Sequence, residues 1–175
     1  MIGSLPISWD QLIEIVNRND IDKLYRSRDC KKCYDMHKQH LIYQGSSVEN
    51  YVLQKLKWHK GDDGNYFGES SRPYHVERNQ FPYFFTPDLV HLVAWLKTEI
   101  PPDPHSPLGD ISEETRKRLD ALITELFVLR VGIDRSRLIW FRNWGALQSI
   151  KAVPHIHIVV KNLSKEEEFK ISTEL

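Results

Sequence analysis

Residues 152–160 have the sequence AVPHIHIVV, an apolar run that contains two histidines one residue apart. Its length and its β-branched residues predict a buried strand. Successive side chains of a strand point to opposite faces of the sheet, so His155 and His157 share one face. Ile156 and Ile158 share the other. The isoleucine face predicts core packing, and the histidine face is the candidate functional surface.

Helical periodicity dominates the first third of the chain. Ser8–Gln11 has the form of a capping box, and apolar residues follow it at helical spacing. Two further helices are predicted from Asp29 towards Tyr43 and from Ser47 to about Trp58. The turn-forming run KGDDGN, residues 60–65, ends this helical part.

Strands and one long helix follow. Alternating or continuous apolar residues predict strands at 74–77, 90–96 and 137–141. Between the last two, an amphipathic helix starts at Asp110 or Ser112 and stops near Gly132. Helices first, then strands around one long helix, indicate an α+β fold with an antiparallel sheet. The long helix should cover one sheet face and leave the other for a ligand.

The chain has 175 residues, of which 41% are hydrophobic, and this suits one domain. We expect a single α+β domain over residues 1–163. Its helical N-terminal part covers residues 1–60, and its sheet and long helix cover residues 74–163. Residues 164–175, SKEEEFKISTEL, are charged and are expected to form a frayed tail.

The charges of the chain balance, with 24 Lys and Arg residues against 24 Asp and Glu residues. No overall field therefore draws the protein to nucleic acid or to an anionic membrane. No apolar stretch reaches the roughly 20 residues that cross a bilayer, and residues 1–10 lack the regions of a signal peptide. We expect a cytoplasmic protein that binds neither nucleic acid nor membrane.

The two cysteines, Cys30 and Cys33, lie too close in sequence to staple a fold through a disulfide. Packing must therefore hold the structure together. Lys23, Arg26 and Arg28 form a short basic group nearby, and solvated surface is the expected place for it.

Three motifs resemble the histidine-triad superfamily of nucleotide hydrolases and transferases. The first is Val90–Lys97, VHLVAWLK, a histidine followed by an apolar run and a lysine. After a helix come Asn143 at a strand end, Gln148-Ser149 in a loop, and the His-Ile-His strand at 155–157. The resemblance spans about residues 81–160 and implies a histidine-triad-like sheet.

The resemblance also implies roles for these residues. His157 matches the histidine that attacks the α-phosphorus and forms a nucleotidyl-imidazole intermediate. His155 would orient it or bind the phosphate. Asn143 and Ser149 match donors to phosphate oxygens, and the backbone N–H groups of residues 148–150 would stabilise developing charge. His157, His155 and Ser149 are the predicted catalytic residues.

Further ligand contacts are predicted around this set. Arg142 is a local cation that suits bidentate phosphate binding. Trp144, in the same loop, suits stacking on a base or sugar. Gln148, His91 and Lys97 complete the predicted ligand-binding residues.

The chain departs from the superfamily pattern at the third histidine. Val159 stands there, and valine neither donates nor accepts a hydrogen bond. Leu147 replaces the usual glycine before Gln-Ser, and the gap from Ser149 to His155 is longer than usual. A protein that binds a nucleotide without cleaving it therefore stays an alternative.

Most of the chain resembles an uncharacterised fungal family that includes the N-acetylglucosamine-induced protein. The resemblance rests on NQFPY (79–83), HLVAWLK (91–97), WFRN (140–143), QSI (148–150) and HIH (155–157). It implies a link to amino-sugar metabolism.

Two functions stay open. The first is a nucleotide or sugar-nucleotide site with hydrolase or nucleotidyl transferase activity through a histidine nucleophile. The second is a noncatalytic binding or regulatory protein of the amino-sugar response that acts through protein partners. The base, the sugar and the oligomeric state stay open with them.

The cysteines also raise the question of zinc, because His37 and His40 follow them on the same predicted helix. The four span about 15 Å at about 1.5 Å per residue, so one ion cannot bind them all. The resemblance implies another set, the ligands of zinc-bearing histidine-triad and galactose-1-phosphate uridylyltransferase proteins: Cys30, Cys33, His91 and His155. Zinc there would leave His157 free, and the rest of the predicted site requires no cofactor.

Overall fold

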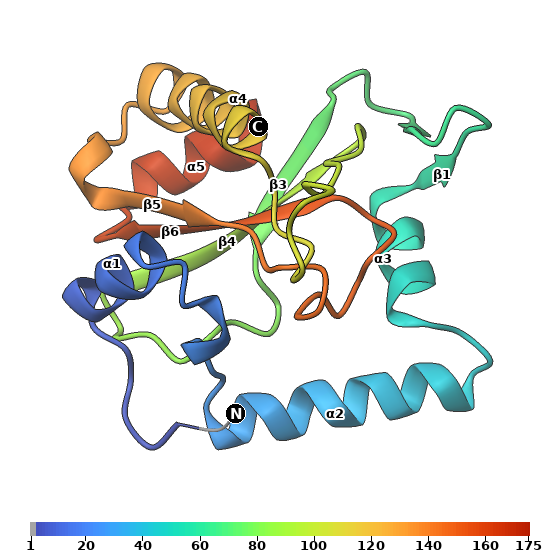
Figure 1. Ribbon diagram of the computed structural model, residues 1–175, viewed down its shortest axis with the longest axis horizontal. Helices are drawn as coiled ribbons and strands as arrows, with labels where there is room; N and C mark the ends of the chain where they lie inside the picture. The colour runs from blue at the N-terminus through green and yellow to red at the C-terminus, as the bar shows by residue number, and fades with distance from the viewer. Residues whose placement is uncertain (1–2) are drawn as a thin grey trace.

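The computed structural model describes residues 3–175, and these residues confirm the α+β fold (Figure 1). They form five α-helices, a four-stranded antiparallel sheet and a two-stranded hairpin. The helices are α1 (Trp9–Asn17), α2 (Arg28–Tyr43), α3 (Val48–Leu56), α4 (Glu113–Ile123) and α5 (Lys165–Glu174). The strands are β1 (Trp58–Lys60), β2 (Tyr66–Gly68), β3 (Tyr74–Arg78), β4 (Leu89–Leu96), β5 (Leu138–Phe141) and β6 (His155–Lys161).

The four-stranded sheet has the order β3-β4-β6-β5, with every neighbouring pair antiparallel. Strands β4 and β6 form its centre. Their register places Trp95 opposite His155 and Val93 opposite His157. Residues opposite each other point to the same face, so the central strands bring their histidines together.

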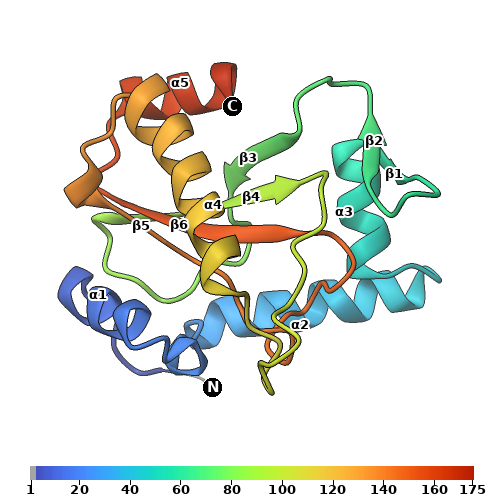
Figure 2. The ribbon, with the colours of Figure 1, turned by 45° about the horizontal axis from the view of Figure 1, so that its top comes forward.

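Helices α4 and α5 lie over one face of this sheet, the α4 face (Figures 1 and 2). Ile156, Ile158 and Val160 of β6 are fully buried there in one continuous apolar cluster with Leu119 and Ile123 of α4. The prediction that the long helix covers one face is confirmed.

Ser112, and not Asp110, caps the long helix, whose first residue is Glu113. The Ser112 hydroxyl accepts a hydrogen bond from the backbone N–H of Thr115. After α4 the chain continues as a π-helical segment, η2 (Thr124–Arg130). Gly132, with φ +89°, lies just beyond it, in a backbone conformation that suits glycine.

The opposite face, here called the histidine face, lies on the side of α1, α2 and α3 (Figures 1 and 2). It carries two separate apolar clusters, one against α1 and one against α3. Along β4, His91 lies between Leu89 of the first cluster and Val93 of the second. The polar histidines therefore occupy the space between two apolar patches.

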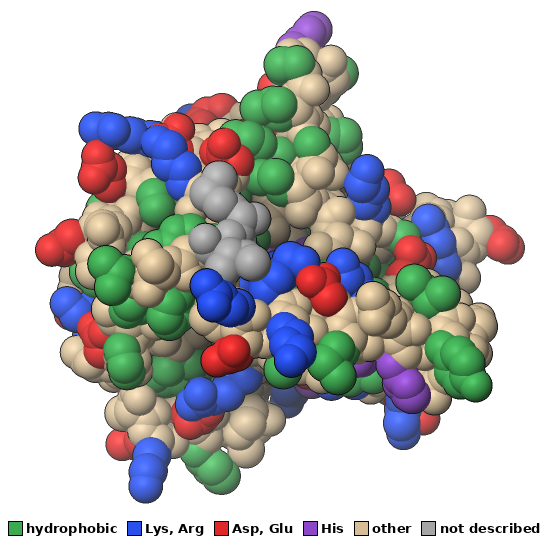
Figure 3. Space-filling model, turned by 90° about the horizontal axis from the view of Figure 1, so that it is seen from below, with side chains coloured by type: hydrophobic (Ala, Val, Ile, Leu, Met, Phe, Trp, Pro, Cys, Tyr) green, Lys and Arg blue, Asp and Glu red, His purple; other side chains and the backbone are tan. Residues whose placement is uncertain are grey.

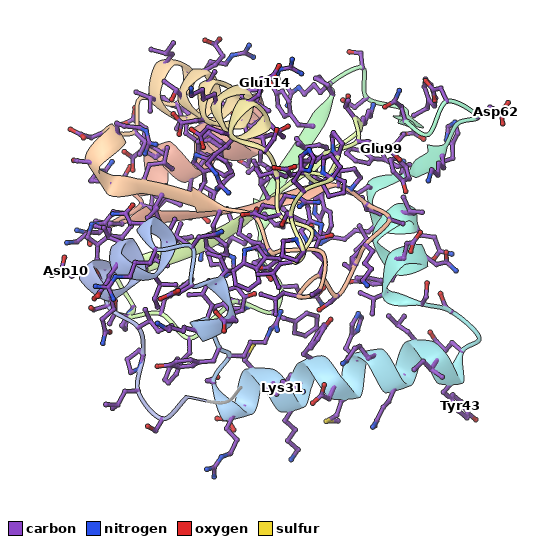
Figure 4. The ribbon with its side chains drawn as sticks, viewed as in Figure 1. Asp10, Lys31, Tyr43, Asp62, Glu99 and Glu114 are labelled. Atoms are coloured by element: carbon purple, nitrogen blue, oxygen red, sulfur yellow. The ribbon has the colours of Figure 1, made fainter. Side chains whose placement is uncertain are left out.

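Helix α2 lies at the edge of the molecule, across the histidine face. Its Tyr34 and Leu41 are buried, whereas Met36 and Tyr43 are exposed on the outer side. Tyr43 lies at the end of α2, away from the sheet (Figure 4). Seen from below Figure 1, this side of the molecule shows basic side chains gathered near its middle (Figure 3).

Residues 164–175 do not form the expected frayed tail. Ser164 caps helix α5 and forms a capping box with Glu167. Ile171 and Leu175, four positions apart, are buried in the apolar cluster of the α4 face. The charged composition was misleading, because two apolar side chains on one side of a helix dock it onto the core.

The expected helical part, residues 1–60, ends in a strand. Strand β1 pairs with β2 as an antiparallel hairpin, and residues 61–65 connect the two. Strands of three residues are too short to show apolar alternation, so the sequence predicted only a loop here.

Among residues 3–175, no helix combines the length and the apolar character needed to span a membrane.

Candidate functional site

A cavity, here called the inner cavity, lies between the histidine face and helices α2 and α3. The space open to the centres of water molecules amounts to about 90 Å³. Side chains from α2 reach toward the sheet across this region (Figure 4). The polar side chains that line it include Arg26, His37, Asn143, Ser149, His155 and His157. The cavity therefore joins α2, the sheet and the loop before β6.

The buried histidines form a hydrogen-bonded chain. The backbone N–H of Tyr83 donates to Nδ1 of His91 over 3.2 Å. Nε2 of His91 lies 3.0 Å from Nδ1 of His157. Nε2 of His157 in turn lies 3.2 Å from Nδ2 of Asn143. Both ring nitrogens of both histidines therefore have neighbours within hydrogen-bond distance.

The backbone N–H of Tyr83 favours one placement of the protons in this chain, and the Asn79 amide nitrogen, 3.4 Å from Nε2 of His91, is then not bonded to that ring. Because a backbone N–H only donates, Nδ1 of His91 accepts, and the neutral ring carries its proton on Nε2. His91 then donates to Nδ1 of His157, whose own proton lies on Nε2. Two donors do not bond, so the Asn143 amide satisfies this proton when it is rotated by a half turn, oxygen toward Nε2. His157 is therefore a donor without a free electron pair.

His155 has the opposite arrangement. Its Nδ1 lies 2.8 Å from the carbonyl oxygen of Val153. A carbonyl oxygen only accepts, so the neutral His155 ring carries its proton on Nδ1 and a free electron pair on Nε2. The ring lies 5.0 Å from the Trp95 ring, centroid to centroid. Among the buried His91, His155 and His157, His155 alone keeps a ring nitrogen available as an acceptor.

Burial lowers the pKa of all three histidines. The pKa of His91 falls to about 3, through burial first and the charge of Arg26 second. Burial and then the neighbouring His91 and His155 hold the pKa of His157 well below its usual value. Burial also lowers the pKa of His155, against the hydrogen bond to Val153. At neutral pH the three rings are therefore uncharged.

Arg26 supplies the positive charge of the inner cavity. Its Nε donates to the carbonyl oxygen of Phe81 over 2.9 Å. Its guanidinium carbon lies 4.6 Å from the centre of the Tyr34 ring and 5.3 Å from that of Tyr83. These contacts hold the side chain by cation–π attraction and leave its terminal N–H groups available.

The other charged side chains of the cavity neutralise each other. Lys55 forms an ion pair with Glu77, which also accepts a hydrogen bond from Nε1 of Trp95. Among residues 3–175, Arg26 is the one charged side chain that lines the inner cavity without a carboxylate partner. The inner cavity therefore carries a net positive charge.

The structure brings four predicted site residues together at the inner cavity: Asn143, Ser149, His155 and His157. His91 lies behind His157, in the hydrogen-bonded chain. Val159, at the position of the third histidine, is fully buried and lies opposite His91 in the sheet. That position belongs to the apolar cluster against α1.

Arg142 and Gln148 line a second cavity on the other side of His155, together with Lys151. Among residues 3–175, His155 is the one residue that lines both cavities. Arg142 donates to the backbone carbonyls of Gly109 and Ile100, and burial lowers its pKa. Arg142 therefore does not reach the space in which His157 and Ser149 lie.

Two predicted ligand contacts point elsewhere. Nε1 of Trp144 donates to the side-chain oxygen of Asn19, and the ring packs in the cluster against α1. The ammonium of Lys97 donates to the carbonyl of Ser70 and lies over the Trp58 ring. Neither side chain lines the inner cavity.

The predicted zinc ligands do not converge. Cys30 packs its thiol against the carbonyl of Pro82, and burial raises its pKa, whereas Cys33 is exposed. His91 uses both ring nitrogens in its hydrogen-bonded chain. Within the described part of the chain, no three His, Cys, Asp or Glu side chains come close enough to hold a metal ion.

Arg26 and His37 line the inner cavity but were not predicted as site residues. Arg26 was assigned to solvated surface, although it is half-buried against two tyrosines. Nε2 of His37 is the buried side-chain polar atom that lacks a hydrogen-bond partner within residues 3–175. Both precede or belong to α2, and no sequence pattern relates that helix to the sheet.

The sequence matches known proteins along most of its length. Residues 8–161 match the family described as "Protein of unknown function (DUF3605)". N-acetylglucosamine-induced protein 1 of Candida albicans is 30% identical over 90% of this chain and 69% of that protein. The Saccharomyces cerevisiae protein described as "Uncharacterized protein YPL067C" is 34% identical over 87% of this chain and 77% of that protein.

A solved structure shares the fold. It is described as "Crystal Structure of HTC1", and it superposes with a TM-score of 0.72 at 30% sequence identity. The match covers 94% of this chain and 92% of that chain. The helical N-terminal part and the sheet therefore recur together in a relative.

Proposed function

The chain belongs to the DUF3605 family of proteins of unknown function, and we propose that it binds a small phosphate-bearing ligand in the inner cavity. The ligand class comprises nucleotides, sugar nucleotides and sugar phosphates. One observation carries the proposal: Arg26 lines the cavity as a half-buried cation without a carboxylate partner among residues 3–175.

A half-buried cation without a partner is unfavourable unless an anion joins it. The three neutral histidines do not compete for that anion, and Lys55 and Glu77 balance each other. A guanidinium offers two parallel N–H groups to a phosphate, which makes arginine a frequent phosphate ligand. Ser149 and the free Nε2 of His155 add polar contacts for the uncharged part of the ligand.

The name of one relative supports a role in the amino-sugar response. N-acetylglucosamine-induced protein 1 shares 30% of its matched residues with this chain. A protein induced by an amino sugar suits a ligand that is itself a sugar derivative. The leading proposal is therefore a noncatalytic binding protein of this response.

A hydrolase or nucleotidyl transferase is the second candidate, and the free Nε2 of His155 favours it. A histidine nucleophile needs an unprotonated ring nitrogen. His157, the predicted nucleophile, carries its proton on Nε2 and donates it to Asn143. A covalent step in this geometry would therefore use His155.

A thermal-shift panel tests the binding function. The panel comprises nucleoside monophosphates, sugar nucleotides, hexosamine phosphates and inorganic phosphate, against wild type, Arg26→Met and the exposed control Arg28→Met. A ligand at a hundred times its dissociation constant adds about 2.7 kcal/mol of stability. We expect a shift in wild type and in Arg28→Met that Arg26→Met loses. A panel without any shift, or a shift that Arg26→Met retains, contradicts the proposal.

A further inference from the structure

We propose that the ligand of the inner cavity is a monosaccharide phosphate, with its sugar ring against His155 and its phosphate at Arg26. This inference rests on the proposed binding function and narrows its ligand class. It depends on the size of the cavity, the placement of its polar groups and the tilt of its aromatic rings.

The cavity has room for a single ring. About 90 Å³ is open to the centres of water molecules, which is space for several waters. One pyranose ring with a phosphate group suits a space of this order.

The polar groups of the cavity come from three separate walls. Nε2 of His155 is presented by β6, and the Ser149 hydroxyl by the loop before it. Nε2 of His37 comes from α2, where it is buried without a hydrogen-bond partner among residues 3–175. A buried polar atom of this kind requires a partner, and a ligand can supply it. Sugars carry hydroxyl groups around the whole ring, so they suit polar groups on several walls.

The aromatic rings of the cavity do not form a slot for a flat base. The Trp95 and His155 rings are inclined at 45°, and the His37 and Tyr51 rings at 76°. The other ring pairs that line the cavity are inclined at 38°, 55° and 85°. A base bound between two rings needs them close to parallel. Tilted rings still present single apolar faces to the C–H groups of a sugar.

Arg26 also lines a neighbouring pocket, together with Tyr83. It is half-buried, whereas His155 is buried and Ser149 is exposed. With the phosphate at Arg26, the sugar ring lies toward His155 and Ser149. The phosphate and the sugar ring of one ligand are thus bound by different residues.

Isothermal titration calorimetry tests this inference with five probes: glucose 6-phosphate, glucosamine 6-phosphate, AMP, UDP-N-acetylglucosamine and inorganic phosphate. We expect at least one sugar phosphate to bind about tenfold or more tightly than AMP, the sugar nucleotide and inorganic phosphate. His155→Gln and Ser149→Ala should each weaken the sugar phosphate by about tenfold and leave the affinity for inorganic phosphate unchanged.

The two histidines of α2 provide a matched pair of variants. His37→Gln should weaken the sugar phosphate, because His37 faces the cavity, and His40→Gln should not, because His40 is exposed on the same helix. If His155→Gln fails to fold, Ser149→Ala and the two variants of α2 still test whether the cavity recognises the sugar ring.

The outcomes separate this inference from the proposed function. Tightest binding of AMP or of UDP-N-acetylglucosamine overturns the monosaccharide class and keeps phosphate-ligand binding. Inorganic phosphate that binds as tightly as the sugar phosphates overturns ring recognition alone. The absence of binding by all five probes overturns both.

Discussion

The same four strands supply both faces of the sheet, yet the two faces are packed in different ways. The α4 face is one continuous apolar cluster, closed by α4, η2 and α5. The histidine face is divided into two apolar clusters, with His91, His155 and His157 between them. Apolar burial on the α4 face therefore stabilises the fold more than apolar burial on the histidine face, where polar side chains line a cavity.

The difference has a physical consequence for the histidines. A buried imidazole must be neutral and hydrogen-bonded, and His91 and His157 achieve this by bonding to each other and to Tyr83 and Asn143. His155 bonds to Val153 through Nδ1, and its other nitrogen has no hydrogen-bond partner among residues 3–175. Of the three buried imidazoles on the histidine face, two are structural and one is available to a ligand.

The largest expected effect is on the α4 face. Ile158→Ala removes a fully buried side chain from the continuous cluster and should lower the free energy of unfolding by about 2–5 kcal/mol. Ile139→Ala, the same change at a half-buried position of β5, should cost less. Urea unfolding measures both. Equal losses would show that the two faces do not differ in packing as described.

The next largest effect on stability is expected in the hydrogen-bonded chain of the buried histidines. Asn143→Leu keeps the volume of the buried side chain but leaves Nε2 of His157 and the hydroxyl of Tyr83 without their partner. The expected loss is about 1–3 kcal/mol. Asn50→Leu, at an exposed position of α3, should stay within about 0.5 kcal/mol of wild type. An Asn143→Leu variant as stable as wild type would contradict the hydrogen-bonded chain described for His91 and His157.

Acid should destabilise the histidine face selectively. The folded-state pKa of His91 is about 3, below the unfolded value near 6.5, so the unfolded chain binds the proton first as the pH falls. Its contribution to stability is full above pH 6.5 and is lost toward pH 3, by about 1.4 kcal/mol per pH unit. His91→Gln should reduce this slope, and the exposed control His105→Gln should not. Denaturation measured at several pH values between 4 and 7 distinguishes them.

The smallest effect is expected at the cysteines. Cys33→Ser changes an exposed side chain that lines neither cavity, so stability should stay within about 0.5 kcal/mol of wild type. Added zinc should leave the melting temperature of both proteins unchanged. Zinc that stabilises wild type but not Cys33→Ser would restore the metal-site hypothesis.

Much of the fold followed from local patterns. Alternation in AVPHIHIVV separates His155 and His157 from Ile156 and Ile158, and the structure places the two sets on opposite faces. Helical spacing and caps located α1, α2 and α4 to within a few residues. Helix α5 and the β1–β2 hairpin were not predicted, because a few apolar contacts and short strands leave only weak patterns in a sequence.

The candidate site was predictable only in part. Asn143, Ser149, His155 and His157 lie close in the sequence, and the structure brings them to one cavity. Trp144 and Arg142 are neighbours of Asn143 in sequence but point away from the cavity in space. Sequence proximity at a loop does not fix the direction of a side chain.

By itself, the sequence determined most of the helices and the strands of the main sheet, and which face each strand residue occupies, because those depend on periods of two and 3.6 residues. Only the tertiary structure decided the roles of the histidines. His91 and His157 are 66 positions apart, and their contact, with the N–H of Tyr83, is the basis for assigning the protons of the two rings. Arg26 and His37 reach the cavity because the chain crosses the histidine face there. Such long-range contacts depend on how elements pack, and no local period encodes them.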